Sequence, residues 1–96
     1  MIDLDKVEAM AKFIFETSKA ARDRGMLSIW TVYDRPKDYP DTFVARRFEA
    51  GNGLHGPTDD VVTGDLDQIT EAMEMCGLYC MPRAPSDDLR IVETWM

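Results

Sequence analysis

The sequence predicts an α+β fold in which a small antiparallel sheet of about four strands is packed by two helices. Two capped amphipathic segments indicate the helices, and two pairs of strand-like segments indicate the sheet. Their order is α-β-β-α-β-β, and short loops within each pair favour antiparallel strands. The 96 residues are enough for one hydrophobic core and too few for a second, so we expect a single domain over residues 1–96.

The first predicted helix spans residues 3–22, where apolar side chains recur at helical spacing. Acidic residues gather at its start and basic residues near its end, as the helix dipole prefers, and Gly25 follows as a stop. Phe13 falls outside the main apolar stripe of this helix. It is therefore a candidate contact with a second subunit.

Two strands should follow the first helix. Residues 27–34 (LSIWTVYD) are rich in β-branched and aromatic side chains, which alternate between two faces. The second strand is predicted over residues 42–50, after a proline-containing loop at 35–41. Residues 51–60 (GNGLHGPTDD) combine three glycines with a proline, so we expect them to be the most mobile loop.

The second predicted helix spans residues 66–76. Asp65 is placed to cap it, and Gln68, three residues later, is placed to reach back to the cap. The remaining two strands are expected at residues 78–81 and 89–95, joined through residues 85–88.

Negative charge is concentrated in one third of the chain. Residues 48–82 contain no Lys or Arg, whereas the rest of the sequence is nearly neutral within a formal net charge of −7. Such a field attracts a basic partner and repels a nucleic-acid backbone, so we expect no direct nucleic-acid binding. The predicted partner-binding residues are Asp59, Asp60, Asp65, Asp67, Glu71 and Glu74.

Three of these carboxylates, Asp67, Glu71 and Glu74, recur on the outward face of the second helix. Like charges at this spacing destabilise a helix by about 0.2–0.5 kcal/mol per pair. They stand roughly 6 and 4.5 Å apart along the helix axis, a scale similar to phosphates on one nucleic-acid strand. Two interpretations stay open: a solvated face that keeps the protein soluble, or a surface that docks in a basic groove.

Arg46 and Arg47 are adjacent in the second strand, so their side chains point to opposite faces of the sheet. The arginine beneath the helices needs a carboxylate partner. The sequence offers Asp34 or Glu93, on neighbouring predicted strands, for this ion pair.

Residues that could carry chemistry are sparse. Cys76, Cys80 and His55 do not supply the four ligands of a zinc site, so we expect no metal, no cofactor and two reduced cysteines. His55 is the single histidine and has no partner nucleophile or base near it in sequence, which predicts a non-enzymatic protein. No apolar run approaches the roughly 18 residues of a membrane span, so a cytoplasmic protein without membrane contact is expected.

The segment WTVYDRPKDYPDTFVARR, from Trp30 to Arg47, and the closing IVETW resemble small uncharacterised proteins of alphaproteobacteria and their phages. This resemblance implies a bacterial or phage origin and brings no catalytic residues. It also makes residues 1–25 look like an addition to an α+β module at residues 26–96. Small acidic phage proteins that block host machinery, including anti-CRISPR proteins, are similar in size and charge by class analogy alone.

The sequence therefore predicts a non-enzymatic acidic binding protein that docks on a basic surface of a protein partner. A sharper form of this hypothesis is an anti-CRISPR-like inhibitor that blocks a nucleic-acid-binding groove. The alternative is a homodimeric structural protein joined through the Phe13 side of the first helix.

Overall fold

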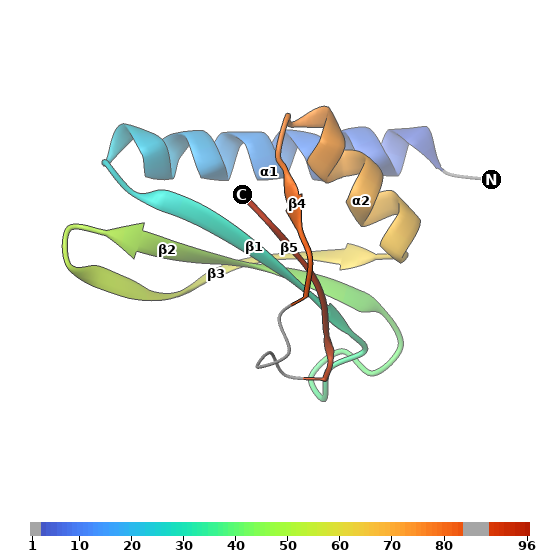
Figure 1. The fold of residues 1–96 in the computed structure, drawn as a ribbon. Coiled ribbons are helices and arrows are strands. Elements are labelled where there is room, and N and C mark those ends of the chain that lie inside the picture. Colours follow the sequence, from blue (N-terminus) through green and yellow to red (C-terminus); the bar gives the residue numbers. More distant parts are fainter. Residues whose placement is uncertain (1–2, 84–88) are drawn as a thin grey trace.

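The computed structural model describes residues 3–83 and 89–96, and it has two helices against a five-stranded antiparallel sheet (Figure 1). The strands lie side by side in the order β3-β2-β1-β5-β4. Both helices cover the same face of the sheet (Figure 1). The elements are α1 (Leu4–Asp23), β1 (Leu27–Asp34), β2 (Phe43–Gly51), β3 (Leu54–Gly64), α2 (Leu66–Met75), β4 (Cys80–Met81) and β5 (Ile91–Trp95).

The predicted α+β class is confirmed, but the predicted strand number and order are wrong in one region. Residues 51–60, expected to be a mobile loop, form a tight turn and the first half of β3. Asn52 and Gly53 have φ angles of 51° and 76°, which fit the two-residue hairpin turn that an Asn-Gly pair favours. Pro57 is tolerated because β3 is an edge strand. The order is therefore α-β-β-β-α-β-β.

Local signals at the helix ends explain why both predicted helices form. Lys6 N donates to Asp3 Oδ1 at 3.2 Å, so Asp3 caps α1. Asp65 N donates to Gln68 Oε1 at 3.2 Å at the start of α2. Gly77 follows α2 with a φ of 73°, the left-handed conformation that a glycine adopts without strain.

One hydrophobic core joins both helices to the sheet. Trp30 of β1 is fully buried, and its Nε1 donates to Ser18 Oγ of α1 at 3.0 Å. Ile14 of α1 and Ile69 of α2 are also fully buried in the same cluster. Residues from the segment 1–25 therefore pack into the same core as the rest of the chain.

The C-terminal strands are shorter than predicted, covering Cys80–Met81 and Ile91–Trp95. Two hydrogen bonds extend this pairing, from Tyr79 N to Met96 O at 2.9 Å and from Met96 N to Tyr79 O at 3.0 Å. The predicted connection at residues 85–88 lies outside the described residues. Neither helix in the described ranges has the length and apolarity to cross a membrane.

Candidate functional site

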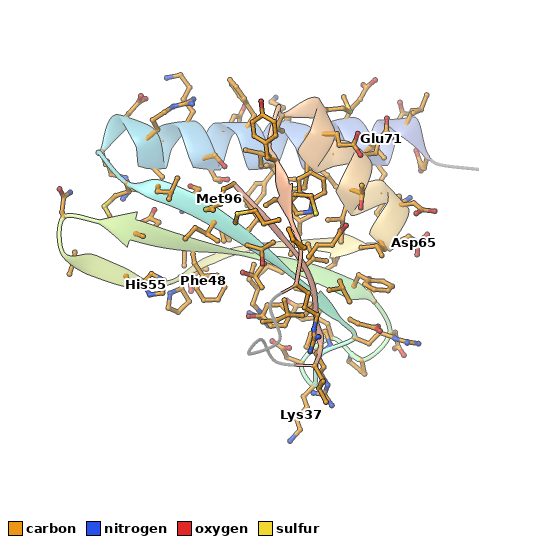
Figure 2. The ribbon with its side chains drawn as sticks, in the orientation of Figure 1. Lys37, Phe48, His55, Asp65, Glu71 and Met96 are labelled. Carbon is orange, nitrogen blue, oxygen red and sulfur yellow. The ribbon has the colours of Figure 1, made fainter. Side chains whose placement is uncertain are left out.

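The outer side of α2 presents four of the predicted binding carboxylates to solvent. Asp65, Asp67, Glu71 and Glu74 are all exposed, and Figure 2 shows Asp65 and Glu71 at two positions along this helix. None of the four takes part in an ion pair with another described residue. We call these four residues the acidic surface.

Asp65 and Asp67 lie at the start of α2, where negative charge favours a helix, whereas Glu71 and Glu74 are unfavourable for its stability. Glu71 lies four residues after Asp67 and three before Glu74, so both of its neighbours on this face repel it. Glu74 stands in the last turn, where the helix dipole is negative, and that turn contains no basic residue. Stability of α2 therefore does not account for Glu71 and Glu74.

Glu93 of β5 adds a further carboxylate beside α2. Thr70 Oγ1 of α2 donates to Glu93 Oε1 at 3.2 Å. Glu93 was a predicted partner of the buried arginine, and this prediction is wrong. The β1–β5 register pairs Glu93 with Val32 and brings it next to α2, which no local sequence signal indicates.

The two cysteines lie near the acidic surface but are poor nucleophiles. Both are free, with Cys76 half-buried and Cys80 exposed. Burial raises the pKa of the Cys80 thiol, and the carboxylates of Glu93 and Glu74 raise it further. Burial also raises the pKa of Cys76. Both thiols therefore stay protonated near neutral pH, and the thiolate needed for nucleophilic attack is scarce.

Exposed apolar side chains border the acidic surface at the end of α2. Met75 is 56% exposed and Tyr79 is 80% exposed. Cys76, between them in sequence, donates from Sγ to Ala11 O at 3.2 Å and also contacts the backbone of Phe15 in α1. Phe15 is itself 52% exposed. These residues carry no binding signal in the sequence: Phe15 falls on the apolar stripe of the first predicted helix, and Tyr79 falls in a predicted strand.

Asp60, in contrast, is engaged inside the protein by a buried arginine. Arg47 is 5% exposed, and its Nη2 lies 2.7 Å from Asp60 Oδ2. Its Nη1 lies 2.8 Å from Glu49 Oε1. The buried arginine thus has carboxylate partners as predicted, but they are Asp60 and Glu49 in place of Asp34 or Glu93.

An irregularity in β3 brings Asp60 to Arg47. Arg46 pairs with Val61 and Phe48 pairs with Pro57, so three residues of β3 lie opposite the single Arg47 of β2. Thr58 Oγ1 donates to Arg47 O at 2.8 Å within this bulge. Asp60, which the sequence placed in a loop, therefore lies in a strand and forms a structural ion pair with Arg47.

Glu49 is the most strongly perturbed carboxyl group of this cluster. Hydrogen bonds from Arg24 and then from Arg47 lower the pKa of Glu49 to about 2. Arg24 reaches it from the end of α1, with Nη2 at 2.5 Å from Glu49 Oε1. The cluster of Arg24, Arg47, Glu49 and Asp60 is balanced in charge, which leaves Glu49 and Asp60 little long-range attraction for a partner.

Two other predicted site residues lie away from the acidic surface. Asp59 is exposed on β3, six residues before Asp65, a separation of about 20 Å along an extended strand. Phe13 is 38% exposed, and its ring meets the ring of Trp30 edge-on with centroids 6.5 Å apart. This intramolecular contact accounts for the position of Phe13 outside the main apolar stripe.

His55 lies on β3, far from the described cysteines in the fold. Figure 2 shows it beside Phe48, on the sheet face opposite the helices. Within the described residues, no three side chains of His, Cys, Asp or Glu are grouped to hold a metal ion.

Comparisons of the chain with protein-family models, with curated proteins and with solved structures each found no match.

Proposed function

We propose that this protein is a non-enzymatic binding protein whose acidic surface docks on a basic surface of a protein partner. One observation carries the proposal. The four carboxylates of the acidic surface are exposed and unpaired among the described residues, although Glu49 and Asp60 of the same acidic stretch are held by arginines. Uncompensated charge on one face attracts and orients a partner of opposite charge.

The exposed apolar residues beside the acidic surface support contact with a protein. Protein interfaces combine apolar and aromatic side chains at the centre with polar groups at the rim. Met75, Tyr79 and Phe15 supply the first kind of group next to carboxylates that supply the second. The partner surface we expect is therefore basic with an apolar patch.

A sharper form of the proposal is a phage-type, anti-CRISPR-like inhibitor that occupies a nucleic-acid-binding groove. Asp67, Glu71 and Glu74 rise roughly 6 and 4.5 Å apart along the helix axis, on the scale of successive phosphates. Small acidic phage proteins that block host machinery are similar to this chain in size and charge, an analogy of class alone. A groove built for a polyanion would accept this helix face in place of its own ligand.

A charge-reversal experiment tests the proposal. The triple variant Asp67→Lys, Glu71→Lys, Glu74→Lys is compared with wild type in pull-downs from the source cell, with mass spectrometry of the captured protein. The matched control is Asp5→Lys, Glu8→Lys, Glu16→Lys, which makes the same change of charge on exposed positions of α1. We expect the α2 variant to lose the partner, the α1 variant to keep it, and added salt to weaken capture steeply. Equal capture by both triple variants would contradict the proposal.

Competition with nucleic acid tests the groove-blocking form separately. Once the partner is isolated, its complex with this protein is titrated with the partner's own DNA or RNA. Mutual displacement is expected if both occupy one groove. If the partner bound this protein and its nucleic acid at the same time, docking on a basic surface would still stand, but groove blocking would be refuted.

The homodimer alternative is tested through Phe13. Under our proposal, Phe13→Glu leaves the molar mass unchanged and lowers the melting temperature, because the edge contact with the buried Trp30 ring is lost. Light scattering and thermal unfolding measure the two quantities. A wild-type dimer mass that falls to the monomer value in the Phe13→Glu variant would favour the alternative.

A further inference from the structure

A cavity of about 190 Å³ opens between the end of α1, the start of β1 and the Tyr79–Met96 pairing at the C-terminal edge. It lies apart from the acidic surface, and none of the four residues of that surface lines it. Met26, Leu27, Leu78 and Met96 form its apolar walls. A cavity of about 150 Å³ with apolar walls accommodates a molecule the size of benzene, so this one has room for a small organic ligand.

The polar groups that line the cavity are donors. Ser18 Oγ accepts a hydrogen bond from Trp30 Nε1 at 3.0 Å, and Ser28 Oγ accepts one from Arg47 Nη1 at 3.2 Å. Neither hydroxyl donates a hydrogen bond to a described residue, so each proton is available to a ligand acceptor. A serine hydroxyl that already accepts offers its own O–H to a ligand.

Arg22 supplies a positive charge at the same cavity. Its guanidinium is in no ion pair with a described residue, although it lies on an acidic protein. Its neighbour in sequence, Asp23, is held by Lys19 at 2.9 Å. Guanidinium groups bind carboxylates through paired, charge-assisted hydrogen bonds.

Three of the groups that line the cavity are held in place by the fold. The serine hydroxyls are oriented by Trp30 and Arg47, which are 0% and 5% exposed. Met96 is held by its two backbone hydrogen bonds with Tyr79, at 2.9 and 3.0 Å. These groups require little further ordering when a ligand enters, which favours binding of a small molecule.

We propose that this cavity binds a small organic carboxylate with an apolar tail, of the size of benzoate or hexanoate. The carboxylate accepts hydrogen bonds from Arg22 and from the hydroxyls of Ser18 and Ser28. The tail packs against Met26, Leu27 and Leu78. This site is independent of the proposed docking function, because it shares no residue with the acidic surface.

The test is an NMR titration of the full chain with benzoate, followed through backbone amide shifts. Saturable shifts confined to residues 18–28, 78–79 and 96 are expected, with a Kd of about 1 mM or lower for a ligand of this size. Benzyl alcohol, which lacks the charge, and acetate, which lacks the tail, should each bind at least about threefold more weakly.

Arg22→Gln should weaken benzoate binding at least about threefold, because it removes the charge and keeps a polar side chain. Lys6→Gln is the matched control, since it removes one exposed cation near the start of the same helix, away from the cavity and in no ion pair with a described residue, and its Kd should equal that of wild type. The amide spectrum itself reports whether each variant is folded. Linear shifts that do not saturate, or equal Kd values for Arg22→Gln and wild type, would overturn the proposal.

Discussion

Two groups of carboxylates in the Lys- and Arg-free stretch, residues 48–82, differ in whether the fold pairs them with arginines. Glu49 and Asp60, in the β2–β3 hairpin, bond to arginines that lie outside the stretch in sequence. Glu71 and its neighbours on α2 face solvent without such a partner among the described residues. The hairpin carboxylates therefore stabilise the protein, whereas those of α2 are available for contact. A count of charges along the sequence does not distinguish the two groups.

The largest expected effect on stability follows from removing the central arginine of the cluster formed by Arg24, Arg47, Glu49 and Asp60, here called the hairpin cluster. Arg47→Met leaves the partly buried Asp60 without a cation and Glu49 with Arg24 alone, and we expect a loss of about 3 kcal/mol in the free energy of unfolding. Urea denaturation measures this loss. Arg46→Met is the control on the opposite face, where Arg46 pairs with Asp38 and lies over Tyr39. Arg46→Met should lower the free energy of unfolding by less than about 1 kcal/mol. Equal losses for the two variants would contradict the larger role given to the buried arginine.

Acid should weaken the hairpin cluster through Glu49. Its pKa is lowered from 4.5 to about 2 in the folded protein, so its contribution is complete above pH 4.5 and is lost as the pH falls toward 2. Glu49→Gln should cost about 1 to 2 kcal/mol at neutral pH and flatten the pH dependence in this window. Chemical denaturation at several pH values measures both. If the free energy of unfolding of Glu49→Gln fell between pH 4.5 and 2 as steeply as that of wild type, Glu49 would not be the source of the acid sensitivity.

The smallest effect on stability is expected at α2, and its sign is opposite. Glu71→Lys replaces two repulsive pairs, with Asp67 and Glu74, by attractive ones, which should stabilise the protein by about 0.5 to 1 kcal/mol. Under the proposed function, the same variant should bind the partner more weakly. Thermal unfolding and the pull-down assay measure the two effects. If Glu71→Lys lowered the melting temperature, the carboxylates of α2 would stabilise the fold as those of the hairpin cluster do.

The sequence predicted the features that depend on neighbours along the chain. The two helices follow from apolar spacing, and the ends of α2 follow from local signals at Gln68 and Gly77; Asp3, predicted as the first residue of the first helix, caps it. The exposed carboxylates of α2 follow from the same spacing. Glycines and Pro57 at residues 51–60 are typical of a loop, which is why the sequence does not predict β3. The Asn52-Gly53 pair in the same segment is a strong hairpin signal, and it is the local feature that indicates the additional strand.

By itself, the sequence determined the fold class, the helix faces and the concentration of negative charge, because these depend on local spacing and composition. The tertiary structure decided which charges are compensated. The β3 bulge places Asp60 at Arg47, the end of α1 brings Arg24 to Glu49, and the β1–β5 register moves Glu93 to α2. Ion pairs form over a few ångströms between residues far apart in sequence, so they depend on strand register and on packing, which local patterns do not specify.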